Sequence, residues 1–214
     1  HGGSIFAEGW LRDLLSWSAI GVPIFFVISG FVIPYSLWTG GYSPGQFGRF
    51  LLKRMIRLQP PYAVAVLVAV ALSVRYGFHA GEPLRLDTAD VLMHASYLVD
   101  VGKWAGFHVD WYAPVFWTLA YEFQFYIVAA LAFPLITSRR REVRLAAFAI
   151  FFALKAGGKG PFLYELADLF LLGIAIFQHK IALAGRREFL LTAGVATLSI
   201  SLQHPSFLIY GPMI

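Results

Sequence analysis

The feature that most constrains this chain is a long stretch near its start that carries no charge. Residues 14–48 contain no Asp, Glu, Lys or Arg, and the apolar centre of this window runs from Ile20 to Leu37. Leu58–Val74 and Val115–Ile136 are comparable windows, and the latter contains a single charge, Glu122. A transmembrane helix needs about 17 to 25 predominantly apolar residues. The three windows therefore predict three membrane-spanning helices.

The composition also favours an integral membrane protein over a soluble one. Of the 214 residues, 58% are hydrophobic and only 14% are charged, whereas about a quarter of an ordinary soluble domain is charged. The formal net charge of +5 comes from separate basic clusters, which is typical of membrane-protein loops rather than of a nucleic-acid interface. The chain has no cysteine, so it can hold no disulfide, thiolate nucleophile or cysteine-ligated metal ion.

Three shorter apolar windows follow at Leu145–Leu154, Leu166–Phe177 and Phe189–Leu202. Each predicts a further span, although a tilted, interfacial or buried helix can have the same length. In the second long window, Pro60 and Pro61 suit the first turn of a helix and are expected to open it. The predicted fold class is thus all-α, a polytopic membrane helix bundle with about six spans.

The charges between these windows predict how the helices cross the membrane. Lys and Arg accumulate in loops that stay in the cytoplasm. The loops after the first, third and fifth windows carry net charges of +4, +3 and +2, whereas residues 75–114 carry −2 and the charges of residues 155–168 cancel. This alternation predicts six spans, with the first running from outside to inside. Val91–Val101 is then expected to be a re-entrant or interfacial segment of the outer loop.

Two arginines of the first basic loop are candidates for ligand binding. Arg54 and Arg57 lie in RFLLKRMIRLQPPY, and their spacing of three puts them on one face of a helix. Two guanidinium groups there could hold a phosphate-bearing ligand from the cytoplasmic side through paired hydrogen bonds. A cytoplasmic loop is ordinarily basic and attracts anionic lipid, so the same residues also fit a plain membrane-surface loop.

Glu122, in FWTLAYEFQFY, is the candidate acidic residue. A charge at mid-membrane costs about 2.5 to 3.5 kcal/mol on insertion scales, so it is usually turned inward for a reason. Its carboxylate could orient a base, bind a substrate hydroxyl or pair with an arginine. A structural ion pair between helices fits the bare sequence equally well.

His1 is the candidate base, and it stands directly before Gly-Gly-Ser. Imidazole is the usual proton acceptor near neutral pH, so a histidine at the outer end of a missing helix would suit general-base catalysis. The same four residues also match the scar that an affinity tag leaves. The other histidines lack mutual metal-ligand spacing and are interpreted as structural or solvated, with no metal site predicted. They are His79, His94, His108, His179 and His204.

The absence of several enzyme motifs excludes some kinds of chemistry. The sequence contains no phosphate-binding Walker loop, no G-x-G-x-x-G and no H-E-x-x-H, which are the signatures of nucleotide sites and of one class of zinc enzymes. Ser29 and Gly30, in VISGF, are small residues in an apolar window. We expect this pair to allow a second helix to approach closely.

Taken together, these segments resemble the acyltransferase family 3 membrane proteins, which O-acylate sugars, lipopolysaccharide and peptidoglycan. The order and spacing of the matching segments carry the resemblance, and they span most of the chain. In the family's order they are His1 with a short following loop, GVPIFFVISGFVI (Gly21 to Ile33), KRMIRLQPPY (Lys53 to Tyr62), FWTLAYEFQFY (Phe116 to Tyr126) and LFLLGIAIF (Leu169 to Phe177).

The resemblance implies a role for each candidate residue. His1 looks like the family's essential histidine at the outer end of its first helix. Arg54 and Arg57 match the R-x-x-R pair implicated in handling acyl-coenzyme A, and Glu122 matches the acidic residue of W-[ST]-L-x-x-E-x-x-F-Y. The family usually has about ten spans. We therefore expect residues 1–214 to be one membrane acyltransferase domain that is truncated at both ends.

The function that the resemblance implies is O-acyl transfer in the cell's inner (plasma) membrane. An acyl group, most simply acetyl, would move from acyl-coenzyme A to a carbohydrate or glycolipid hydroxyl, with no permanently bound cofactor and no nucleic-acid partner. His1 would deprotonate the acceptor or carry the acyl group briefly, and Glu122 would orient a polar partner. The alternative is a transporter or flippase for an anionic glycolipid or small solute, with Glu122 and the arginines along its pathway. A third hypothesis, which applies if His1 is a tag remnant, is a non-catalytic membrane scaffold.

Overall fold

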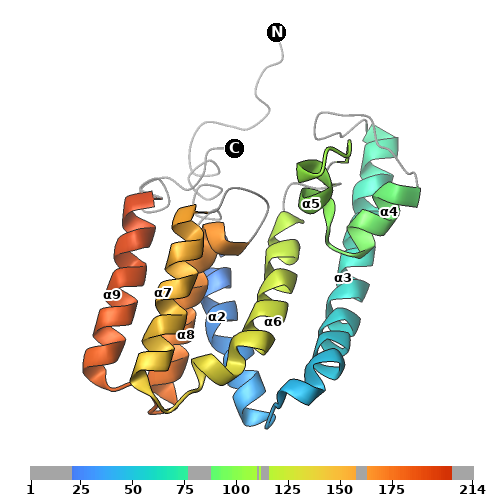
Figure 1. The fold of residues 1–214 in the computed structure, drawn as a ribbon. Coiled ribbons are helices and arrows are strands. Elements are labelled where there is room, and N and C mark those ends of the chain that lie inside the picture. Colours follow the sequence, from blue (N-terminus) through green and yellow to red (C-terminus); the bar gives the residue numbers. More distant parts are fainter. Residues whose placement is uncertain (1–20, 77–87, 110, 112–115, 158–162, 204–214) are drawn as a thin grey trace, which may run out of the picture. The chain divides into compact units, whose positions relative to one another are not determined.

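The computed structural model describes residues 21–76, 88–109, 111, 116–157 and 163–203 of the chain (Figure 1). Within these ranges every regular element is a helix and no strand occurs, so the all-α prediction is confirmed for this part of the chain. The elements are α2 (Gly21–Thr39), η1 (Pro44–Gln46), α3 (Phe47–Tyr76), α4 (Thr88–Ala95), α5 (Val99–Trp104), α6 (Trp117–Ile136), α7 (Arg141–Gly157), η2 (Leu163–Leu166), α8 (Ala167–Lys180) and α9 (Arg186–Gln203).

The helices belong to two compact units. The first unit contains α2, the end of α6 from Ala132 onward, and α7, α8 and α9. The second contains η1, α3, α4 and α5, together with α6 as far as Leu131. Since Arg54, Arg57 and Glu122 all lie on α3 and α6, the second unit carries the candidate site.

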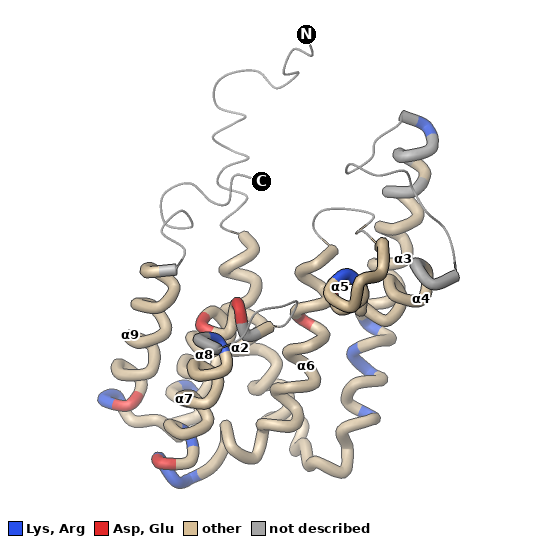
Figure 2. Tube along the Cα trace, turned by 45° about the horizontal axis from the view of Figure 1, so that its top comes forward, with Lys and Arg blue, Asp and Glu red and all other residues tan. Residues whose placement is uncertain are grey.

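In the part of the chain that the structure describes, two helices are long and apolar enough, by length and composition, to cross a membrane. They are α2 and α6, of 19 and 20 residues, and they match the first and third apolar windows. The three shorter windows also form helices, namely α7, α8 and α9. Their charged residues lie at the helix ends, and the middle turns carry none (Figure 2). The helix predictions for these five windows are therefore confirmed, while their number as spans stays a prediction.

The second window differs from the prediction at its start. The helix α3 begins at Phe47, so Pro60 and Pro61 lie inside it and do not open it. Proline fixes φ near −65°, which a helix accepts, but inside a helix it lacks the N–H donor and its ring crowds the carbonyl four residues earlier, at a cost of about 3 kcal/mol or more. The helix begins upstream on good helix formers such as Leu51 and Lys53 and continues through the prolines in spite of this cost. The basic segment is thus part of the helix and not a separate loop.

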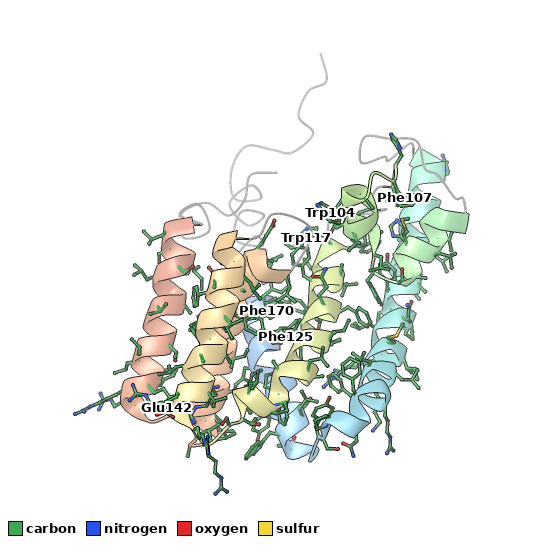
Figure 3. All side chains as sticks on the ribbon, viewed as in Figure 1. Trp104, Phe107, Trp117, Phe125, Glu142 and Phe170 are labelled. Atoms are coloured by element: carbon green, nitrogen blue, oxygen red, sulfur yellow. The ribbon has the colours of Figure 1, made fainter. Side chains whose placement is uncertain are left out.

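Close approach of α2 and α8 holds the first unit together. A Cβ atom added at Gly30 would clash with the carbonyl oxygen of Phe170, and one added at Gly173 would clash with that of Val27. Ser29 is buried beside this contact, and Phe170 is labelled on α8 in Figure 3. Small residues let two helix backbones pack this closely. The predicted role of Ser29 and Gly30 in helix packing is confirmed.

Two buried ion pairs join other helices of the first unit. Arg144 binds Glu188 through two hydrogen bonds, from Nε to Oε1 at 2.9 Å and from Nη2 to Oε2 at 2.6 Å. Lys155 pairs with Asp168, which also accepts a hydrogen bond of 3.0 Å from Ser199 Oγ. Arg144 was expected among the charges of an exposed loop, but its side chain is only 4% exposed. The pairing explains this burial, because a charged group can leave water when a partner satisfies it.

Candidate functional site

The second unit brings together three of the four predicted site residues. Arg54 and Arg57 lie on α3, and Glu122 lies on the first half of α6. The charges of both arginines act on Glu122. His1, the fourth residue, lies outside the described residues.

The guanidinium group of Arg54 lies near two aromatic rings, one on its own helix α3 and one on α6. Its guanidinium carbon lies 5.2 Å from the ring centre of Phe50 and 5.4 Å from that of Tyr126. A guanidinium group within about 6 Å of a ring centre is attracted to the ring face. The Arg54 side chain is half-buried, whereas Arg57, one turn further along α3, is exposed. The pair therefore presents one guanidinium group held against aromatic rings and one that is exposed.

Glu122 forms the polar centre of this site. The hydroxyl of Tyr126, one turn further along α6, donates a hydrogen bond of 2.5 Å to Glu122 Oε1. Both residues are buried, with 9% and 3% of their surfaces exposed. Because Tyr126 also faces Arg54, this tyrosine links the arginine to the carboxylate. The arrangement can hold an anionic ligand group at Arg54 and a hydrogen-bonding group at Glu122.

An aromatic cluster adjoins Glu122 within the same unit. The hydroxyl of Tyr62 lies 2.8 Å from His94 Nδ1, and both residues are buried. The ring of Tyr97 packs 5.3 Å from Tyr62 and 5.3 Å from Phe123, measured between ring centres. His94 has a buried hydrogen-bond partner in Tyr62, as a structural histidine would, and its role stays a prediction. Tyr97 was not predicted, since its neighbours in the sequence carry no motif.

The segment Val91–Val101 supplies Tyr97 to this cluster. It forms the end of α4, a turn and the start of α5, and neither helix has the length that a membrane span requires. Gln59 Nε2 of α3 donates a hydrogen bond of 2.7 Å to the carbonyl oxygen of Ala95, which holds the segment against α3. The lengths of these helices show that neither crosses a membrane alone, and the interfacial or re-entrant placement stays a prediction.

Two properties of Tyr97 are unfavourable for a residue with only a packing role. Its backbone is left-handed, with φ of 60°, at the end of α4 where glycine is usual. Its hydroxyl is buried and forms no hydrogen bond with any residue that the structure describes. A buried hydroxyl without a partner costs about 1 to 3 kcal/mol. Burial, and next the charge of Glu122, raise the pKa of Tyr97 to about 12, so the hydroxyl keeps its proton.

The segment Gly41–Gly45 reads GYSPG and contains the G-x-S-x-G pattern, so the interpretation that this motif is absent from the sequence was wrong. In hydrolases that pattern places a serine on a sharp turn between a strand and a helix. Here it lies between α2 and α3, and Ser43 is exposed at the start of η1 with its backbone N–H 3.3 Å from Gln46 Oε1. Ser43 is therefore a turn residue and not a nucleophile candidate.

Metal ligation has no candidate cluster in this part of the chain. Among the described residues, no three His, Asp or Glu side chains are placed to hold one ion. The groups available for binding are the cationic pair Arg54 and Arg57, the carboxylate of Glu122, and the hydroxyls of Tyr126 and Tyr97.

Comparison with known proteins identifies the family. The sequence profile described as "Acyltransferase domain" matches residues 1–213. Peptidoglycan O-acetyltransferase OatA of Listeria monocytogenes serovar 1/2a is 34% identical over 128 residues, which cover 53% of this chain and 20% of OatA. The chain thus spans about a fifth of the length of this relative. No solved structure shows a significant match. The resemblance to acyltransferase family 3 is therefore confirmed, and the chain belongs to this family of acyltransferases.

Proposed function

We propose that the full-length protein is a membrane O-acyltransferase that moves an acetyl group from acetyl-coenzyme A to a hydroxyl of a cell-surface carbohydrate. The observation that supports this most is the convergence of Arg54, Tyr126 and Glu122 in one compact unit of a family member. The similarity to a peptidoglycan O-acetyltransferase supports both the acetyl group and the type of acceptor. No permanently bound cofactor is needed for this reaction.

The donor would bind with its phosphates at Arg54 and Arg57. Arg57 is exposed and free to meet a phosphate from the cytoplasm, while Arg54 is held by Phe50 and Tyr126. Guanidinium groups bind phosphate through paired, charge-assisted hydrogen bonds. The acyl-bearing arm of the donor would then extend along α6 toward Glu122.

The transfer itself would use His1 and an acceptor hydroxyl. The hydroxyl oxygen attacks the thioester carbonyl carbon, the new C–O bond forms and the C–S bond breaks. His1 takes the proton of the acceptor as general base and returns it to the departing thiolate of coenzyme A. Alternatively, His1 carries the acyl group between the two steps. In either case Glu122 would orient a polar group of the site.

We further propose that the protein crosses the plasma membrane several times and that residues 1–214 form one domain of it. The support comes from α2 and α6, from the uncharged middles of α7, α8 and α9, and from the exposed face of α3. Ile56, Val64 and Leu67 on that face are 63%, 61% and 67% exposed. A contiguous apolar surface of this kind is unfavourable in water and suits lipid.

Single cysteines should report this topology, because the chain has none of its own. Cysteines at Gly41 and Arg140 are expected to be protected from an impermeant thiol reagent outside intact cells, and one at Pro83 is expected to be labelled. The reason is the alternation of basic and acidic loops, since basic loops stay inside. Labelling is read by the mass of the purified protein. Labelling at Arg140 with protection at Pro83 would invert the orientation.

Arginine-to-lysine substitutions test the donor site. Arg54→Lys and Arg57→Lys keep the charge but lose the planar fork, so acetyl-coenzyme A should bind more weakly in each full-length variant. The expected loss is about 1 to 3 kcal/mol, or roughly 5- to 150-fold in Kd. The matched control is Arg49→Lys, on the same helix and exposed, which should leave Kd within about twofold. If Arg54→Lys and Arg57→Lys bind acetyl-coenzyme A as tightly as Arg49→Lys does, Arg54 and Arg57 belong to an ordinary membrane-surface cluster.

A further inference from the structure

The hydroxyl of Tyr97 is the one feature of the aromatic cluster that packing leaves unexplained. The ring fills the space between Tyr62 and Phe123, and a phenylalanine would fill it equally well. The hydroxyl adds a buried polar atom that no described residue satisfies. Polar atoms in such a position usually have a partner, so the partner is to be sought among ligands.

The backbone of Tyr97 gives a second, independent reason to expect a function. The N–H of Leu98 donates to the carbonyl oxygen of Met93 at 2.9 Å, which closes the end of α4 in the manner that favours glycine at position 97. A bulky residue with positive φ is a genuine outlier. Strain of this kind persists at sites where it holds a group in a required place. Here it places the Tyr97 ring between α3 and α6.

The position of Tyr97 relative to the proposed donor site defines its ligand. Tyr62, on which Tyr97 packs, follows Arg54 by eight residues on α3, or about 12 Å along a helix axis. Phe123, its other neighbour, is the residue after Glu122. Tyr97 therefore packs about two turns of α3 away from Arg54, and both residues interact electrostatically with Glu122. In an acyl-coenzyme A whose phosphates bind Arg54, the group farthest from the phosphates is the thioester.

We propose that the Tyr97 hydroxyl donates a hydrogen bond to the carbonyl oxygen of the donor's thioester. This inference rests on the proposed function. A carbonyl oxygen is an acceptor, and the hydroxyl remains a donor because it keeps its proton up to about pH 12. Arg54 and Arg57 offset the charge of Glu122 nearby.

The hydrogen bond would act mainly when the acceptor oxygen attacks. As the new C–O bond forms, the carbonyl electron pair moves onto the carbonyl oxygen, which becomes negative. The Tyr97 hydroxyl stabilises that charge and keeps its own proton. When the carbonyl re-forms, the C–S bond breaks and the thiolate leaves with the proton that the acceptor gave up. A donor of this kind lowers the barrier more than it strengthens substrate binding.

The test compares Tyr97→Phe with Tyr62→Phe in the full-length protein. Tyr97→Phe should lower kcat for acetyl transfer by about 10² to 10³-fold, as loss of one such donor does elsewhere, and leave KM for acetyl-coenzyme A within a few fold. Its melting temperature should stay equal or rise, because an unsatisfied hydroxyl is removed. Tyr62→Phe removes a hydroxyl that is satisfied by His94, so it should lower the melting temperature and leave kcat within a few fold.

Three results would overturn the inference. Full activity in Tyr97→Phe would show that the hydroxyl is not used. A rise in KM alone would exclude the thioester carbonyl as its partner. A fall in melting temperature like that of Tyr62→Phe would show that the hydroxyl is satisfied within the protein. Absence of acetyl transfer by the unchanged protein would instead contradict the proposed function, so the two failures are distinct.

Discussion

In the full-length protein, His1→Ala is expected to lower the rate of acetyl transfer by about 10² to 10⁴-fold, which is the usual contribution of a general base. Binding of acetyl-coenzyme A should remain almost unchanged, because in the proposed mechanism the imidazole would act on the acceptor and the arginines would hold the phosphates of the donor. The measurement is the initial rate of transfer to peptidoglycan fragments, with Kd for the donor measured on the same preparation. Full activity in His1→Ala would exclude this residue as base and as acyl carrier.

Glu122→Gln is the companion variant, because it keeps the shape of the side chain and an oxygen that can accept the Tyr126 hydrogen bond. If Glu122 only orients a partner, the activity of the Glu122→Gln variant should fall less than that of the His1→Ala variant. An equal loss would show that the negative charge is needed in the transition state. Loss of folded protein in Glu122→Gln would contradict the orienting role and favour a structural one.

The largest effect on stability is expected from Glu188→Gln. The substitution leaves the guanidinium group of Arg144 buried without its carboxylate, although two carbonyl oxygens, of Ser138 and Arg139, still accept from Nη1 at 2.7 and 3.2 Å. Breaking a buried ion pair in this way costs about 3 to 5 kcal/mol. The free energy of unfolding, measured by denaturant titration of the full-length protein in detergent, should fall by that amount.

Glu142→Gln is the matched control for this experiment. Glu142 also lies near Arg144 in the sequence, in the first turn of α7, but it is exposed at the helix end (Figure 3). Its substitution should change stability by no more than about 0.5 kcal/mol. Replacing both partners, in Arg144→Met with Glu188→Met, should recover much of the loss, because no unpaired charge remains. Equal stability of Glu188→Gln and Glu142→Gln would show that the pair contributes nothing.

Local properties of the sequence sufficed to predict the helices. Apolar windows with at most one charge identified α2, α6, α7, α8 and α9, because a helix of this length needs little more than an apolar run. The start of α3 was missed because the basic segment before Pro60 is itself a good helix former. Proline often marks a helix boundary, but α3 passes through Pro60 and Pro61.

Contacts between distant residues could not be predicted in the same way. Arg144 and Glu188 are 44 residues apart, and each looks like an ordinary charge at the edge of an apolar window. Arg54 and Tyr126 likewise meet only because α3 and α6 belong to one compact unit. Single-sequence patterns report which face of a helix is apolar, but they do not report which helix covers it.

Tyr97 shows most clearly what the sequence alone could not predict. Its neighbours carry no motif, and its importance comes from a backbone angle and from an unsatisfied hydroxyl, neither of which is visible in the sequence. The signal that could have drawn attention to it was a tyrosine between two short helical segments in a loop that is predicted to lie outside the cell.

The most direct measurement is transfer of labelled acetyl groups by the purified full-length protein in lipid vesicles. Acetyl-coenzyme A would be supplied on the side of the basic loops, and cell-surface carbohydrates, with peptidoglycan fragments first, on the other. We expect label on carbohydrate hydroxyls and release of one coenzyme A thiol for each acetyl group transferred, with loss of both in His1→Ala. Movement of an anionic solute or glycolipid across the vesicle membrane, without transfer of label to any acceptor, would contradict the acyltransferase mechanism and support a transporter.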